Sequence, residues 1–133
     1  MAHVFISLGG EFPNIGDALI RRLSAQWVRG VRDFSALTGS APQMWLRQVG
    51  VGPTDTLYRG RRAVFAWVRD LALDRGRPIL MLEPGEVVLD RANVRRQAML
   101  LVACAVAKAK RGVVILPPRA VARRAEVRPW APR

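Results

Sequence analysis

Short runs of apolar residues alternate along this chain with longer segments in which apolar residues recur every three or four positions. The first pattern predicts buried strands, and the second predicts helices that bury one face. Because the short runs are apolar throughout, the sheet they form is expected to be parallel and covered on both faces. The predicted strands are 3–8, 33–37, 56–58, 78–82 and 113–116, and the predicted helices lie between 14 and 30, 42 and 49, 61 and 76, and 90 and 111.

This order of elements predicts an α/β fold, a three-layer Rossmann-like parallel sheet. Residues 1–116 are expected to form this domain, and the Pro- and Arg-rich residues 117–133 are expected to be a linker or tail. Trp27 and Trp67 lie on apolar helical stripes and are therefore predicted to be core residues.

Composition limits the possible partners and sites. The 133 residues fit one domain, and 22 basic against 10 acidic residues give a net charge of +12, which favours an anionic partner. All the basic residues except Lys108 and Lys110 are arginines, so a GC-rich coding sequence is an alternative source of the charge. A single cysteine and a single histidine exclude an intrachain disulfide and a Cys- or His-rich metal site. No secretory signal is visible and the longest apolar run has ten residues (98–107), so a cytoplasmic location is expected.

The loop after the first predicted strand is the richest candidate site, because open parallel sheets bind ligands beyond the carboxyl ends of their strands. Gly9 and Gly10 allow close approach to the backbone, Asn14 is a good N-cap, and Asp17 suits the first turn of a helix. Gly16 keeps the helix entrance open. Two interpretations remain: Asn14 and Asp17 only cap the helix, or they border a site in which Gly10, Asn14 and Gly16 bind substrate and Asp17 acts in catalysis.

Three other loops carry weaker signals. Arg61 and Arg62 fall at a helix N-terminus, where positive charge opposes the helix dipole, so they either bind an anion or are solvated. Glu86, which with Glu83 flanks a Pro-Gly turn, is either a base acting on a sugar hydroxyl or a residue that stabilises the turn. Arg119 follows Pro117-Pro118 and is a further candidate for substrate binding at the same edge.

The string Asn14-Ile-Gly-Asp-Ala-Leu-Ile20, N-x-G-D-x-L-I after a strand and a glycine pair, resembles the N-terminal signature of the polysaccharide pyruvyl transferases. The resemblance implies transfer of the enolpyruvyl unit of phosphoenolpyruvate, without a cofactor, to a sugar of a cell-surface polysaccharide or of its lipid-linked precursor. It also implies that this chain is similar to the first, acceptor-side half of a glycosyltransferase-B-like fold. The family's phosphoenolpyruvate-binding basic residues lie in a second half, so a second domain is expected to be needed for activity. Asn14, Gly16 and Asp17 match the motif and are the site residues it implies.

A small basic nucleic-acid-binding module is the alternative function. The net charge favours it, but the arginines are spread over every segment and no helix-turn-helix or zinc-finger pattern is present, so nucleic acid is not the expected partner. Neither the dinucleotide fingerprint G-x-G-x-x-G nor a phosphate-loop motif occurs in the chain. Peripheral contact with an anionic inner membrane is compatible with a lipid-linked acceptor.

Overall fold

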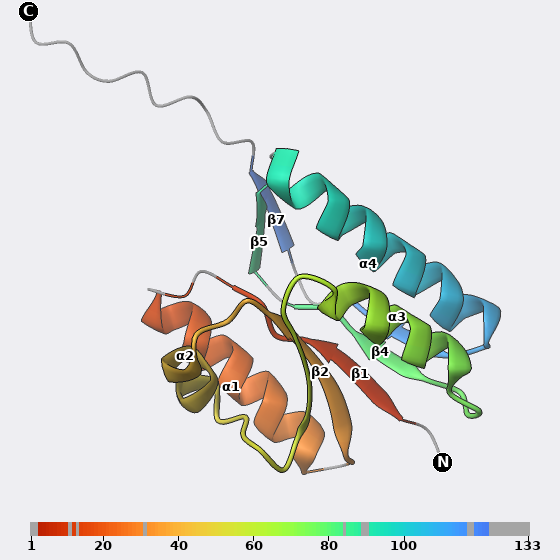
Figure 1. The fold of residues 1–133 in the computed structure, drawn as a ribbon, viewed down its shortest axis with the longest axis horizontal. Helices are drawn as coiled ribbons and strands as arrows, with labels where there is room; N and C mark the ends of the chain where they lie inside the picture. Colours follow the sequence, from red (N-terminus) through yellow and green to blue (C-terminus); the bar gives the residue numbers. More distant parts are fainter. Residues whose placement is uncertain are drawn as a thin grey trace, which may run out of the picture.

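A five-stranded parallel sheet forms the centre of the computed structural model, in the order β3-β2-β1-β4-β6 (Figure 1). The structure describes residues 3–10, 12, 14–30, 32–83, 85–88, 91–116 and 119–122. Every strand predicted from an apolar run is present within two residues of its expected bounds, because such runs fit positions covered on both faces. The strands of this sheet are β1 (Val4–Ser7), β2 (Phe34–Gly39), β3 (Thr56–Arg59), β4 (Ile79–Met81) and β6 (Val113–Ile115).

Four helices cover the two faces of the sheet and complete the three layers (Figure 1). Alternate side chains of β1 divide the core: Val4 and Ile6 pack with the first two helices, and Phe5 packs with the last two. The α/β, three-layer Rossmann-like fold predicted from the sequence is therefore confirmed. The helices are α1 (Ile15–Arg29) and α2 (Gln43–Val49) on one face, and α3 (Ala63–Leu73) and α4 (Arg91–Ala109) on the other.

A second, two-stranded parallel sheet lies beyond the end of the main one, near the beginning of α4 (Figure 1). It pairs β5 (Gly85–Val88) with β7 (Arg119–Ala122). The segment between Glu83 and Asp90 was predicted to be a loop, so β5 is a difference from the expectation. Its partner strand lies 34 positions later, counted from Gly85 to Arg119. The sequence around β5 does not indicate a pairing over that distance. The predicted boundary between domain and tail at residue 116 stays a prediction.

Helix α1 buries a different face from the one its apolar residues suggested. Trp27 is 61% exposed, so its prediction as a core residue was wrong, whereas Trp67 of α3 is fully buried as predicted. The face of α1 that meets the sheet carries Ala18, Arg21, Ala25 and Val28. Small alanines allow the helix to approach the sheet closely, and the most hydrophobic positions of α1 are left outside. These exposed positions are Ile15, Leu19, Ile20, Leu23 and Trp27.

A hydrogen bond between neighbouring elements holds α3 against the edge strand β3. Tyr58 Oη donates to Asp70 Oδ2 at 2.8 Å, and Arg69 Nε lies 2.8 Å from the other carboxylate oxygen. The bond from Arg69, followed by the one from Tyr58, lowers the pKa of Asp70, and partial burial together with Asp70 raises the pKa of Tyr58. This contact fixes the short connection between β3 and α3.

Trp27 of α1 tests which face of that helix is buried, and Trp67 of α3 provides the buried comparison. Trp67→Ala is expected to lower the free energy of unfolding by about 3–5 kcal/mol, because it empties a fully buried site. Trp27→Ala is expected to cost less than about 1 kcal/mol, because most of the indole is in solvent. Urea unfolding of both variants measures the difference, and equal losses would show that Trp27 is buried like Trp67.

The Tyr58 contact predicts a pH-dependent loss of stability. Tyr58→Phe is expected to lower the free energy of unfolding by about 0.5–1.5 kcal/mol at pH 7, the usual contribution of such a hydrogen bond. Because the pKa of Asp70 is lowered in the folded state, the stabilisation is present above the ordinary carboxyl pKa of about 3.9 and is lost as the pH falls through the lowered value. Unfolding curves of both proteins between pH 7 and pH 2.5 are expected to converge at the acidic end.

Candidate functional site

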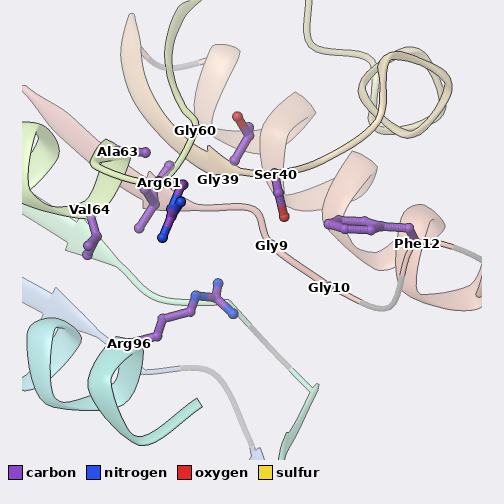
Figure 2. A pocket seen from close by; sticks show the side chains of 12 residues that line it. Gly9, Gly10, Phe12, Gly39, Ser40, Gly60, Arg61, Ala63, Val64 and Arg96 are labelled. Atoms are coloured by element: carbon purple, nitrogen blue, oxygen red, sulfur yellow. The ribbon is translucent and has the colours of Figure 1, made fainter. Parts of the chain in front are cut away.

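A cleft of about 370 Å³ opens at the carboxyl edge of the main sheet (Figure 2). The chain leaves β1 toward β2 on one side and reaches β4 on the other, so the strand order reverses beside β1, and open α/β sheets bind ligands at such a point. The cleft is formed by the loops that follow β1, β2 and β3, by the end of β2, by the first residues of α3 and by one residue of α4. Its lining includes Gly9, Gly10, Phe12, Gly39, Ser40, Gly60, Arg61, Ala63, Val64 and Arg96.

The loop from β1 to α1 provides the glycine-rich wall of the cleft. Asn14 is the N-cap of α1, as predicted: its Oδ1 accepts a hydrogen bond of 3.2 Å from the backbone N–H of Asp17. The Asp17 carboxylate forms an ion pair of 2.8 Å with Arg21 one turn later. A Cβ atom on Gly10 would lie 2.6 Å from Asp17 Oδ2, so residue 10 must be glycine for the carboxylate to keep this position.

Arg21 is buried, with a side chain only 4% exposed, and it bonds to the backbone of the loop between β1 and α1. Its Nε donates to the carbonyl oxygen of Gly9, and its Nη1 donates to the carbonyl of Asp17 at 3.3 Å. A buried guanidinium is stable only when its donors find partners, and here the partners are the loop backbone and the Asp17 carboxylate. Arg21 therefore links the motif residue Asp17 to the glycine pair.

A second buried polar group lies on the other side of the same loop. Glu83, at the end of β4, accepts a hydrogen bond of 3.0 Å from Ser7 Oγ and lies 2.8 Å from Nη2 of Arg96. The Glu83 side chain is 10% exposed and that of Arg96 is 34% exposed. A Cβ atom on Gly9 would overlap Nη2 of Arg96, so the glycine leaves the space in which the guanidinium lies. Glu83 thereby holds the Nη2 group of Arg96, and the same guanidinium lines the cleft.

Arg61 reaches the cleft from the connection between β3 and α3 (Figure 2). The preceding Gly60 has a φ of +88°, which favours glycine, and its N–H donates to the carbonyl of Gly39 at 2.8 Å. Arg62 is the N-cap of α3 and makes no side-chain capping bond. Both arginines are at the helix N-terminus as predicted, but the cleft is lined by Arg61 and not by Arg62.

The structure brings together some of the predicted site residues and separates others. Gly10 and Arg61 line the cleft, and Asn14, Gly16 and Asp17 form the beginning of α1 next to it. Glu86 lies on β5 and Arg119 on β7, both within the second sheet, and their side chains lie outside the described part of the structure. The roles assigned to Asp17, Glu86 and Arg119 stay predictions.

Sequence reasoning missed Arg21, Ser7 and Arg96, and it placed Glu83 at the edge of the site, beside a turn, without its bonds to Ser7 and Arg96. Ser7 and Arg96 are 89 positions apart and meet only because β1 and α4 converge at this edge. Arg21 had a detectable signal, since it is one turn after Asp17, the spacing at which helical side chains form ion pairs. Arg96 is one of many arginines in the chain and carried no such signal.

Among the residues that the structure describes, no group of three or more His, Cys, Asp or Glu side chains is placed to hold a metal ion. No helix in the described part of the chain combines the length and the apolar character that a membrane span requires. Comparison of the chain with family models, with curated proteins and with solved structures found no match.

Adjacent arginines of α1 provide a test of the loop support. Arg21→Met is expected to lower the free energy of unfolding by about 1–3 kcal/mol, because it leaves the Gly9 carbonyl and the Asp17 carboxylate without this donor. Arg22→Met, at an exposed position, is expected to change it by less than about 0.5 kcal/mol. Chemical denaturation compares the two variants, and a similar small effect of both would show that Arg21 does not support the loop.

Proposed function

We propose that this chain is the acceptor-side domain of a polysaccharide pyruvyl transferase. In the proposed reaction two hydroxyls of one sugar become bonded to the same carbon of the enolpyruvyl unit of phosphoenolpyruvate, and phosphate is released. The domain binds the sugar, or the lipid-linked saccharide that carries it, and a second domain supplies the phosphoenolpyruvate site. The proposal implies a cytoplasmic protein that contacts the inner face of the membrane when its acceptor is lipid-linked.

The observation that carries the proposal is the place of the Asn14–Ile20 motif. The motif begins α1 beside the cleft, at the point of the parallel sheet where ligands bind in this class of fold. Asn14 caps the helix and Asp17 is held by Arg21, so in this structure both residues shape the wall of the cleft. The motif residues are therefore proposed to position the loop that meets the acceptor.

The volume and lining of the cleft suit part of a saccharide. About 370 Å³ lies within the usual range of small-molecule sites, and the lining combines glycine backbone, the Ser40 hydroxyl and the Phe12 ring. Backbone groups and hydroxyls bond sugar hydroxyls, and an aromatic ring packs against the apolar face of a sugar. Catalysis by Glu86 on a sugar hydroxyl stays part of the proposal.

The nucleic-acid alternative receives less support from the geometry. Several arginines that would contribute to a basic surface bond to the protein itself: Arg29 pairs with Asp55 at 2.7 Å, and Arg59 donates to the carbonyl of Ala41 at 3.0 Å. Binding of a nucleic-acid duplex to a basic surface would weaken steeply with salt, and it would not change when the cleft is filled.

Saccharide binding to the 133-residue chain tests the proposal directly. Methyl hexosides with free 4- and 6-hydroxyls are expected to give saturation-transfer NMR signals with this chain. Ser40→Trp, which fills the cleft, is expected to abolish the hexoside signals. The matched control Thr54→Trp fills a separate hollow, lined by His3, Arg29 and Asp33, and is expected to leave them unchanged.

Two results would contradict this function. One is the absence of signals from every hexoside with the folded chain. The other is binding of a DNA duplex that falls steeply with salt and is the same in wild type and Ser40→Trp, which would favour the nucleic-acid module.

A further inference from the structure

Two guanidinium groups from distant parts of the chain face one cleft. Figure 2 shows Arg61, from the connection before α3, and Arg96, from α4, directed toward the same space from opposite sides. Like charges repel, so an anion that lies between the two groups would lower the free energy of this arrangement. Within the described part of the chain, Glu83 is the acidic residue that bonds to this pair, and it bonds to Arg96 and not to Arg61.

Arg96 is held in place with donors to spare. Its Nη2 is bonded to Glu83 at 2.8 Å and lies 3.4 Å from Ser7 Oγ. A guanidinium has five N–H donors, and in the described structure the Nε and Nη1 groups of Arg96 have no protein partner. Because Glu83 and Ser7 are buried and fix one edge of the guanidinium, the remaining edge is oriented before any ligand binds.

Arg61 is exposed and has neither an ion pair nor a hydrogen bond with any residue that the structure describes. It precedes α3, where a positive side chain is unfavourable because the helix dipole is itself positive at that end. The helix N-cap, Arg62, provides no side-chain acceptor for the first turn. A bound anion would compensate all three features: the unpaired guanidinium, the dipole and the uncapped N–H groups.

The backbone around the two arginines allows a tetrahedral anion to come close. Four glycines line the cleft, so part of its wall is backbone without a side chain that would exclude an oxyanion. Gly39 and Gly60 have φ values of +58° and +88°, and a Cβ atom on either would meet no atom within 4 Å. The open space beside the arginines is therefore bordered by bare backbone.

We infer that Arg61 and Arg96 form a clamp for the phosphoryl groups of a phosphorylated or diphosphate-linked saccharide. Two guanidinium forks match the several oxygens of a phosphate or diphosphate better than a single carboxylate. The cleft has room beyond the anion for part of a sugar. The saccharide in this assignment rests on the proposed function, whereas the phosphoryl group rests on the two arginines alone.

Isothermal titration of the 133-residue chain with inorganic pyrophosphate and with UDP-galactose tests the clamp. Arg61→Ala is expected to weaken binding of both probes at least tenfold. The matched control Arg62→Ala removes a neighbouring charge that does not line the cleft, and it is expected to change affinity less than twofold. Equal losses in the two variants, or no binding of either probe by the wild type, would overturn the clamp.

Gly9→Ala tests the Arg96 side without removing a charge. The added methyl group overlaps Nη2 of Arg96, the flexible end of a side chain, so the fold is expected to survive while the guanidinium is displaced from Glu83. Binding of pyrophosphate is expected to weaken at least fivefold. Gly52→Ala, where the new methyl group meets no atom within 4 Å, is the control and is expected to bind as wild type. A Gly9→Ala chain that is folded by circular dichroism and binds normally would overturn the role of Arg96.

Further probes separate the clamp from the proposed function and name the source of the phosphoryl group. If Arg61→Ala keeps the methyl hexoside signals but no longer binds UDP-galactose, the result supports both the clamp and the proposed function. Pyrophosphate binding that depends on Arg61, without any saccharide binding, supports the clamp and contradicts the acceptor-side function. Geranylgeranyl diphosphate represents lipid-linked acceptors and UDP-galactose represents nucleotide-linked acceptors, so the probe that binds more tightly identifies the source of the phosphoryl group. If each probe binds Arg61→Ala as tightly as it binds the wild type, the clamp is overturned.

Discussion

Two arginines pack against one glycine pair from opposite faces of the sheet, and the shape of the carboxyl edge depends on this contact. Arg21 rises from α1 on one face and bonds to the carbonyl of Gly9, while Arg96 comes from α4 on the other and lies against the same residue. A Cβ atom on Gly10 would be 2.8 Å from Arg21 Nε, and one on Gly9 would overlap Arg96. The loop between β1 and α1 follows this path because each guanidinium group occupies space that a side chain at residue 9 or 10 would fill.

The two arginines differ in how much of their hydrogen-bonding capacity the protein uses. Arg21 is almost fully buried and bonds to Gly9 and Asp17, so it acts in the structure of the loop. Arg96 is one-third exposed and bonded through one nitrogen, so it is oriented but not saturated. Asp17, the charged residue of the motif, acts through Arg21 on the glycine pair. A short sequence motif at a helix start can thus determine the geometry of a cleft that its own side chains do not line.

The fold could be predicted from the sequence because its strands are continuous apolar runs and its helices lie between residues that favour helix starts and stops. The buried face of α1 could not, because the exposed positions of that helix are more hydrophobic than the alanines that pack on the sheet. For the site, the glycine pair and Asn14 were found from local rules of loops and caps. Arg96 and its bond to Glu83 depend on α4 crossing to the edge of β1, and nothing local in the sequence indicates that meeting.

The net charge of +12 is informative only after the arginines are separated by what they contact. Arg29, Arg69 and Arg96 are each paired with an acidic residue, so their charges are balanced within the protein. Arg61 has no such partner in the described structure and stands at a helix end that disfavours positive charge. Arg61 is exposed, so water stabilises its charge in part, and an anion in the cleft beside it would stabilise it further. The local imbalance at this cleft, rather than the total charge, is therefore the feature that calls for an anionic ligand.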